Sequence, residues 1–156
     1  MHTTIRVLLA YMVTILMAGM AAQKAEATLG QTASSITSDK NALSAVHRAT
    51  MTRSNYTVQE FASGSGTVRE FVSLSGIVFA IAWNGLVHPD LTTLLGAYNA
   101  EYQSALKQTV RKRGVRRHQV ISDQVIVEKW GHMRNLQGRA YLPALIPSGV
   151  NINEIN

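Results

Sequence analysis

The chain has 156 residues, of which 46% are hydrophobic and 15% are charged, and its formal net charge is +6. This length is typical of a single domain. The absence of cysteine from the sequence excludes disulfide scaffolds, thiolate catalysis and cysteine-ligated metal sites. The composition therefore predicts a basic, single-domain protein that is stabilised by its packed core.

The first 27 residues have the pattern of a secretory signal peptide. Arg6 supplies a positive charge, an uncharged apolar stretch occupies 7–22, and alanines stand at 25 and 27. The stretch is shorter than the ~20 residues with which a helix spans a bilayer. We therefore expect cleavage after Ala27, an exported protein that is periplasmic or secreted, and membrane contact only through this segment before cleavage. An uncleaved membrane anchor is the alternative.

After the signal peptide, residues 28–156 are expected to form one domain that begins with a flexible leader at 28–34. Apolar residues then recur at helical spacing behind Ser35, a suitable N-cap, and predict a helix at about 36–50.

A sequence repeat follows this helix. Residues 59–68 and 69–78 match at six of ten positions, and each copy contains a Ser-Gly pair. A period of ten suits successive strands of about seven residues joined by tight turns. The repeat predicts a β-meander with strands near 55–62, 67–74 and 77–83, of which the third is apolar on both faces and is expected to be covered on both sides.

A second helix is expected at about 90–110. Pro89 and Asp90 suit a helix start, and leucines and tyrosines then form one apolar stripe. Beyond it, apolar residues at 120–121, 125–127 and 139–142 predict two or three further strands, with a turn at Gly131 or Gly138, before prolines impose an irregular ending. The predicted fold class is α+β, an antiparallel β-meander sheet with two helices packed against it in the order α-β-β-β-α-β-β.

The excess positive charge lies in one segment. No acidic residue occurs between Glu101 and Asp123, and six cations fall within the twelve residues that end at His118. These cations are Lys107, Arg111, Lys112, Arg113, Arg116 and Arg117. The segment either binds a polyanion through salt-sensitive contacts or is a solvated helix end. Because no aromatic residue is interleaved, nucleic acid is disfavoured as a partner, and an anionic component of the cell envelope is the candidate.

Fragments spread along the mature chain carry a family resemblance. They are Gly66-Thr67-Val68-Arg69-Glu70, Val78-Phe79-Ala80, Pro89-Asp90-Leu91, Gly131-His132-Met133-Arg134 and Gly138-Arg139-Ala140-Tyr141-Leu142-Pro143. In this combination the chain resembles a family of small exported bacterial proteins, domain of unknown function 2844. The resemblance implies an exported bacterial protein of one domain, with no established activity and no catalytic residues to transfer.

Two groups of residues are candidates for a site. Trp130, His132 and Arg134 could form a polar pocket, and the alternative for His132 is a turn histidine bonded to backbone. Glu60 and Glu70, repeated on neighbouring strands, could form a carboxylate pair for acid/base work. A structural ion pair, with Arg69 or Arg53 as the partner, is the alternative for these glutamates.

No histidine pair has metal-ligand spacing, and no glycine-rich phosphate loop precedes a helix, so no metal or cofactor is predicted. The leading hypothesis is a non-enzymatic binding or structural module of the bacterial envelope, and its partner is not identified by the sequence. The alternatives are a polyanion-binding module that uses the segment 107–118, and a small hydrolase that uses His132 or the pair Glu60 and Glu70.

Overall fold

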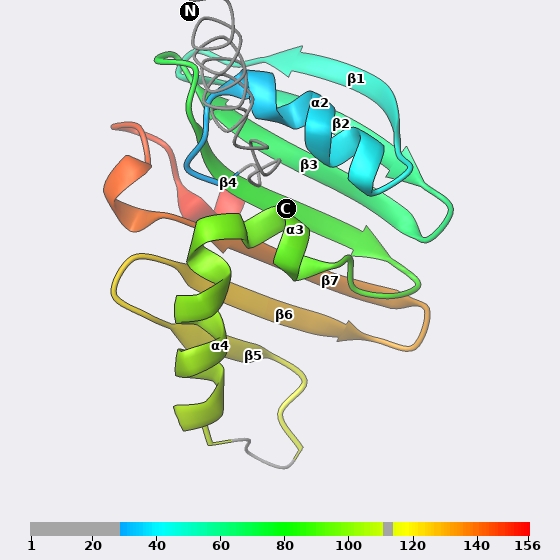
Figure 1. Cartoon of the computed structure of the whole chain (residues 1–156), viewed down its shortest axis with the longest axis vertical. Helices are drawn as coiled ribbons and strands as arrows, with labels where there is room; N and C mark the ends of the chain where they lie inside the picture. Colours follow the sequence, from blue (N-terminus) through cyan, green and yellow to red (C-terminus); the bar gives the residue numbers. More distant parts are fainter. Residues whose placement is uncertain (1–28, 111–113) are drawn as a thin grey trace, which may run out of the picture.

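The computed structural model describes residues 29–110 and 114–156, which form a seven-stranded antiparallel sheet covered on both faces (Figure 1). The strands are β1 Val46–Thr52, β2 Tyr56–Ser63, β3 Gly66–Ser73, β4 Val78–Gly85, β5 His118–Ile121, β6 Ile126–His132 and β7 Asn135–Tyr141. The helices are α2 Ile36–Ala42, α3 Leu91–Leu95 and α4 Asn99–Gln108, with 3-10 turns at Ala33–Ser35, Gly96–Tyr98, Pro143–Leu145 and Ile152–Glu154. The predicted α+β class with an antiparallel sheet is confirmed.

The sheet consists of two meanders joined side by side, in the spatial order β1-β2-β3-β4-β7-β6-β5. The first meander runs from β1 to β4. The chain then crosses one face of the sheet through α3 and α4 before β5, β6 and β7 follow as hairpins, and β7 returns to pair with β4. This return brings Gly138 of β7 opposite Trp83 of β4.

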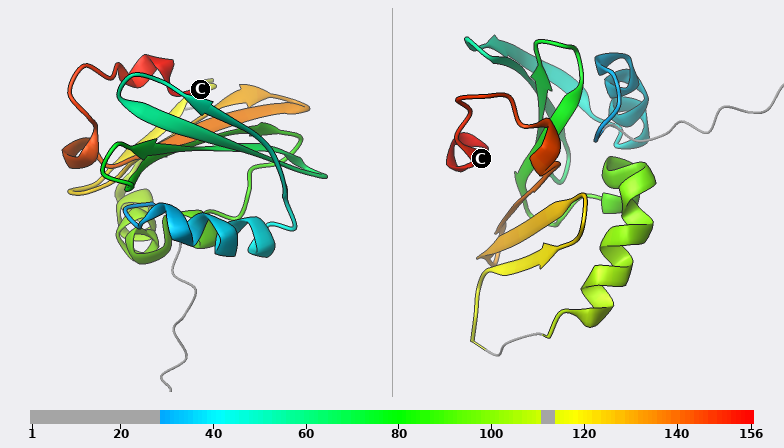
Figure 2. Two further views of the ribbon diagram at one scale, coloured as in Figure 1. Left: turned by 90° about the horizontal axis from the view of Figure 1, so that it is seen from above. Right: turned by 90° about the vertical axis from the view of Figure 1, so that its left-hand side faces the viewer.

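The helices lie on one face of the sheet, here called the helix face, and residues 143–156 cross the other, here called the tail face (Figure 2). Each face has its own hydrophobic cluster. The cluster on the helix face includes Leu94, Leu95 and Tyr102 from the helices, and that on the tail face includes Ile155. Strand β4 contributes to both, and residues 78–83 are at most 4% exposed, so the prediction that this strand is covered on both sides is confirmed.

The predicted helix at 90–110 is present in two pieces. Asp90 caps α3, because its side chain accepts a hydrogen bond from the backbone N–H of Thr92. Gly96 then adopts φ +45°, which ends α3 at Leu95 and redirects the chain into α4. The break lets α4 extend over the β5–β6 hairpin, where Tyr102 is 2% exposed.

The predicted order of elements is wrong at the N-terminal end. The helix expected at 36–50 ends at Ala42, and the following residues form β1, which pairs with β2. Ser44, at φ +48°, makes the turn between them. Strand β1 lies at the sheet edge with Val46 71% exposed, so its sequence has none of the alternation that marks a half-buried strand.

Two other details differ from the sequence prediction. In place of a flexible leader at 28–34, residue Leu29 is 1% exposed, and the backbones of Gly30 and Gln31 bond to that of Val78. The turn expected at Gly131 or Gly138 falls between them at residues 133–134, because the two glycines lie within β6 and β7.

The predicted signal peptide lies outside the described residues. Within 29–110 and 114–156, no helix is both long enough and apolar enough to cross a membrane. Export and cleavage after Ala27 therefore stay predictions.

Candidate functional site

A row of polar side chains crosses the tail face from strand to strand. Directly opposed residues in antiparallel strands share a face, and the register aligns Glu60, Arg69, Ala82, Arg139, Glu128 and Gln119. Arg69 donates to Glu60 at 2.8 Å, and Arg139 donates to Glu128 at 2.6 Å. The row therefore contains two cross-strand ion pairs, one on each side of Ala82.

Glu128 is the most heavily engaged member of this row. Its carboxylate is 4% exposed and accepts hydrogen bonds from Arg139, from Arg117 at 2.8 Å and from Gln119 at 2.7 Å. A carboxylate removed from water needs such compensation to remain ionised. The charge on Glu128 is thus matched by neighbouring side chains and serves the structure.

The same arginines hold the C-terminal segment on the tail face. Arg139 donates to the carbonyls of Ile152 and Ile155, and Arg69 donates to that of Asn156. Between the two guanidinium groups, Ile155 is completely buried in the cluster that includes Ala80 and Ala82 of β4. The tail face is consequently filled by the chain itself.

The helix face carries a second row, in which Trp83, Gly138, Lys129 and His118 are aligned across four strands. The indole of Trp83 lies over Gly138, and a Cβ at position 138 would overlap the ring. Glycine is therefore required there for β4 and β7 to pair with the indole in place.

Trp83 fixes the state of His88, which lies in the loop between β4 and α3. The indole Nε1–H donates to Nδ1 of His88 at 2.9 Å, and because an indole can only donate, Nδ1 must be unprotonated. Burial, and secondarily the positive charge of Lys129, lower the pKa of His88 below its usual 6.5. His88 is thus held as a neutral imidazole whose proton is on Nε2.

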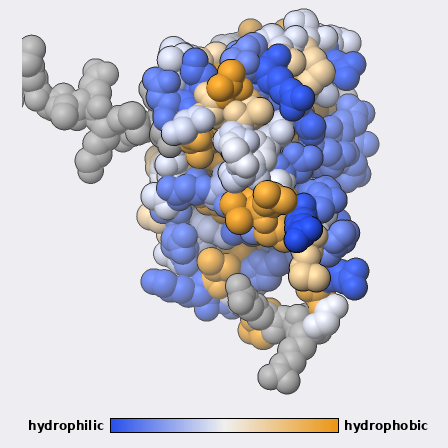
Figure 3. Space-filling view, turned by 90° about the vertical axis from the view of Figure 1, so that its right-hand side faces the viewer, coloured by the Kyte–Doolittle hydropathy of each residue, from blue (hydrophilic) through white to orange (hydrophobic). Residues whose placement is uncertain are grey.

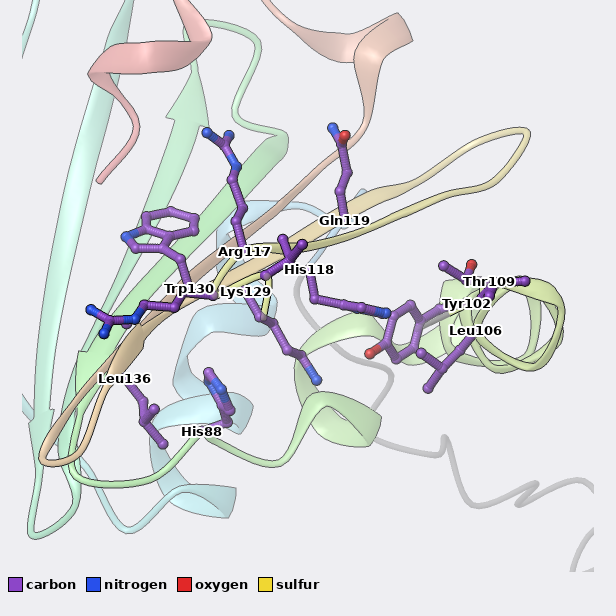
Figure 4. A pocket seen from close by; sticks show the side chains of 14 residues that line it. His88, Tyr102, Leu106, Thr109, Arg117, His118, Gln119, Lys129, Trp130 and Leu136 are labelled. Atoms are coloured by element: carbon purple, nitrogen blue, oxygen red, sulfur yellow. The ribbon is translucent and has the colours of Figure 1, made fainter. Parts of the chain in front are cut away.

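Beside this row is a cavity of about 650 Å³ between α4 and the β5–β6 hairpin (Figure 4). We call it the basic cavity. It is lined by His88, Tyr102, Leu106, Thr109, Val110, Val115, Arg116, Arg117, His118, Gln119, Lys129, Trp130, Gly131 and Leu136. Three of these residues are formally cationic and two are histidines, whereas none is acidic. The lining therefore favours a negatively charged occupant.

Lys129 is the cation that projects from the sheet into this space. Its ammonium lies 5.5 Å from the ring centre of Tyr102, at cation–π distance. Among the described residues, no carboxylate forms an ion pair with it. In Figure 4, Lys129 and His118 lie on one side of the β5–β6 hairpin, and Arg117, Gln119 and Trp130 lie on the other.

Helix α4 forms one wall of the basic cavity and is tied to the hairpin at the far end. Glu101 accepts a hydrogen bond from the backbone N–H of Gln124 at 2.8 Å. A hydrogen bond from Ser122 and bonds from the backbone of this loop lower the pKa of Glu101. The ionised carboxylate therefore helps to hold α4 over β5 and β6.

Hydrophobic side chains also reach the surface around the cavity. Figure 3 shows separate hydrophobic patches among hydrophilic side chains on one side of the molecule. Val110 and Val115, which both line the cavity, are 82% and 58% exposed. The basic cavity thus combines positive charge with apolar surface that faces solvent.

The structure separates the residues predicted to form a pocket. Trp130 lines the basic cavity, and the guanidinium groups of Arg117 and Arg139 each lie 5.7 Å from the centre of its ring. His132 and Arg134 are exposed in the β6–β7 hairpin, where the ring of His132 contacts the backbone oxygen of Met133. Neither of these two residues lines the basic cavity with Trp130.

The cations of the predicted basic segment fall into three groups. Lys107 is exposed on the last turn of α4 and does not line the basic cavity. Arg116 and Arg117 line it. Arg111, Lys112 and Arg113 lie outside the described residues.

Glu60 and Glu70 do not converge. The register places Arg69 opposite Glu60 and Gln59 opposite Glu70, so the two glutamates point to opposite faces of the sheet. Glu60 forms the ion pair with Arg69 on the tail face, whereas Glu70 is 1% exposed on the helix face. In the part of the chain that the structure describes, no group of three or more His, Asp or Glu side chains is arranged to hold a metal ion.

The sequence analysis assigned no role to Lys129 or His88. Lys129 stands in a strand among mixed residues, and its position opposite Gly138 depends on a pairing that the sequence does not specify. A signal was present at His88, because a histidine five residues after a tryptophan at a strand end can bond to it across the turn.

The fold and the basic cavity define a small α+β domain with an anion-favouring pocket. A family model described as "Protein of unknown function (DUF2844)" matches residues 25–155. The chain belongs to this family. Comparison with curated proteins and with solved structures found no match.

Proposed function

We propose that this protein is an exported, non-enzymatic binding module of the bacterial envelope and that its ligand is an anion held in the basic cavity. The observation that carries the proposal is the lining of this cavity, which includes Arg116, Arg117, Lys129 and two histidines but no acidic side chain. Its volume of about 650 Å³ is within the range typical of small-molecule sites.

The electrostatics of the cavity support an anionic ligand. An ammonium in a recess partly shielded from water interacts more strongly with an anion than an exposed ammonium does. Lys129 has such a position and forms no ion pair with a described carboxylate. An anion would therefore gain charge-assisted hydrogen bonds without displacing an internal partner.

The polyanion hypothesis involves part of the same surface. Arg116 and Arg117 belong to the segment 107–118 and also line the basic cavity. A ligand of the cavity would consequently meet the cations that the sequence marked as a candidate anion-binding segment. The assignment to the envelope is supported by the signal-peptide pattern over 1–27.

The hydrolase hypothesis has less support. Glu60 and Glu70 point to opposite faces, and His132 is exposed at a hairpin turn. General acid–base catalysis requires its groups within hydrogen-bonding reach of the reacting atoms. None of these three side chains lines the basic cavity.

Retention on a heparin column, a polyanionic probe, tests where anions bind. The double variant Arg116→Gln/Lys129→Gln removes two cations of the cavity, and Arg48→Gln/Arg53→Gln removes two exposed cations elsewhere. Because both variants lose two charges, a difference between them reports the location of the site. We expect the cavity variant to elute at a clearly lower salt concentration than the control. Elution of both at the same concentration would show that the cavity is not the anion site.

Cell fractionation tests export. We expect the protein in the periplasm or the medium, with a new N-terminus at Thr28. Recovery of the protein from the cytoplasm with Met1 retained would contradict the assignment to the envelope.

A further inference from the structure

We infer that the ligand of the basic cavity is a single-chain anionic amphiphile, with its oxyanion headgroup at Lys129 and its alkyl chain along α4. The inference rests on the proposed function, because it takes the same cavity and specifies the chemistry of the ligand. It follows from three features of the lining: one internal cation, a neighbouring histidine with a fixed proton, and several apolar side chains.

The headgroup position follows from which cations are already engaged. Arg117 donates to the buried carboxylate of Glu128, so part of its charge is compensated inside the protein. Lys129 has no acidic partner among the described residues, and its ammonium is directed over the ring of Tyr102. One cation of this kind suits one headgroup, such as a carboxylate or a phosphate.

Two histidines also belong to the lining. The indole of Trp83 occupies Nδ1 of His88, so the hydrogen-bond donor that His88 retains is Nε2–H. His118 points toward Tyr102 in Figure 4, and its Nε2 is shielded from solvent without a hydrogen-bond partner among the described residues. A shielded side-chain nitrogen without a partner is rare in proteins, and a ligand in the basic cavity would supply one.

The lining also includes apolar side chains, which explain why the ligand needs a chain. Leu106 and Leu136 line the cavity together with Val110 and Val115, and the two valines are more than half exposed. A sugar or an inorganic phosphate would leave these side chains in contact with water. An alkyl chain that lies against them would be removed from water together with them, which is favourable in proportion to the area covered.

Calorimetric titration of the processed protein with a series of carboxylates tests the inference. The series is acetate, octanoate, decanoate and dodecanoate, each below its micellar concentration. We expect the affinity to rise about two- to fourfold for each added methylene. Octanol and octylammonium, which have the chain without the negative charge, should bind at least tenfold more weakly than octanoate.

Different negative results would overturn the amphiphilic ligand alone or the anion-binding function as well. Carboxylate affinities that do not rise with chain length overturn the amphiphile and leave the anion-binding function in place. Absence of binding by every anion, together with unchanged heparin retention of the cavity variant, overturns both. Sedimentation with phosphatidylglycerol vesicles without binding of dodecanoate overturns the single-chain ligand in favour of a lipid surface.

Substitutions at Lys129 test the headgroup position. Lys129→Gln should weaken dodecanoate binding at least tenfold, whereas Lys129→Arg should keep the affinity within about threefold of the wild-type value, since it retains the charge. Lys107→Gln is the matched control, because Lys107 is exposed on α4 outside the lining. Equal affinities of Lys129→Gln and Lys107→Gln would overturn the placement.

A surface substitution tests the chain position without risk to the fold. Val110 is 82% exposed, and Val110→Asp should weaken dodecanoate binding more than octanoate binding because it introduces a charge where the chain lies. Val46→Asp, at a 71% exposed position on β1, is the control. Unchanged dodecanoate affinity in Val110→Asp would overturn the inference even if the Lys129 variants could not be prepared.

Discussion

On the tail face, Arg139 and Arg117 donate to the buried carboxylate of Glu128, whereas on the helix face the ammonium of Lys129 lies over Tyr102 without an ion pair to any described residue. Both faces belong to the same sheet, and Glu128 and Lys129 are consecutive residues of β6. The difference comes from alternation along this strand, which sends one side chain into a compensated network and the next into the basic cavity.

Charged side chains have different roles on the two faces. Charges that are matched internally and covered by the chain stabilise the fold, and their loss should be measured as a loss of stability. Charges that face a cavity contribute little to stability and are available to a ligand. Substitutions on the tail face should therefore lower the free energy of unfolding more than substitutions on the helix face.

The largest effect is expected at Glu128. Glu128→Ala removes the shared acceptor of Arg139, Arg117 and Gln119 and leaves the buried guanidinium of Arg139 without its carboxylate. Loss of one partner of a buried ion pair costs about 3–5 kcal/mol. We expect a fall of this size in the free energy of unfolding, measured by urea denaturation.

Glu60→Ala is the control for this prediction, since the pair of Glu60 with Arg69 is partly exposed. Its cost should be about 1 kcal/mol or less. Equal losses of stability in the two variants would show that the buried ion pair of Glu128 contributes no more than the partly exposed pair of Glu60 and Arg69.

The second effect concerns the C-terminal segment. Ile155 is fully buried against β4, and Ile155→Ala should lower the free energy of unfolding by about 3 kcal/mol, because it removes apolar contact and leaves a cavity. Ile121→Ala, at a 63% exposed position of β5, should change stability by less than about 0.5 kcal/mol. If Ile155→Ala changed the free energy of unfolding as little as Ile121→Ala does, packing of the C-terminal segment against β4 would not stabilise the core.

The strands differ in how well the sequence predicted them. The repeat over 59–78 predicted three strands within one or two residues of their observed ends, because alternation and Ser-Gly turns are local signals. Strand β1 was predicted as helix, since an edge strand exposed on both faces has no apolar alternation. Local patterns therefore specify the centre of this sheet better than its edge.

The candidate site was harder to predict from the sequence because it depends on long-range strand pairing. Lys129 and His118 become neighbours of Trp83 and Gly138 only when β7 returns to β4, and no local pattern encodes that return. The basic segment predicted part of the site, since two of its six cations, Arg116 and Arg117, line the cavity. Trp130 was predicted to share a pocket with His132 and Arg134, but these two residues are exposed at the hairpin end and do not line the cavity.

The third effect is expected at Gly138, which lies beneath the Trp83 indole on the helix face. A Cβ at this position would overlap the Trp83 indole on the helix face and approach the backbone oxygen of Glu128. Gly138→Ala should lower the free energy of unfolding by about 1–3 kcal/mol, as overpacking of a core does. Gly64→Ala is the control, because a Cβ there would meet no atom within 4 Å. A neutral Gly138→Ala would show that the indole can move away from β7 without cost.

The smallest effect concerns the pH dependence of stability and arises on the helix face. Burial first, and the charge of Lys129 second, lower the pKa of His88 in the folded protein below 6.5. The unfolded chain therefore binds a proton more readily, and the contribution of His88 to stability is complete above about pH 6.5 and lost as the pH falls toward its lowered pKa. The hydrogen bond from Trp83 adds to this, because protonated Nδ1 cannot accept it.

Urea denaturation of wild type and His88→Gln at several pH values between 7.5 and 5 measures this contribution. Wild type should lose more stability than His88→Gln as the pH falls, and Lys129→Gln should show an intermediate loss, because it removes the smaller of the two causes while burial remains. Asp90, the nearby acid, caps α3 and is present in all three proteins. Parallel stability profiles for wild type and His88→Gln would mean that His88 is protonated as readily in the folded protein as in the unfolded chain, and that the Trp83–His88 bond does not hold the imidazole in its neutral form.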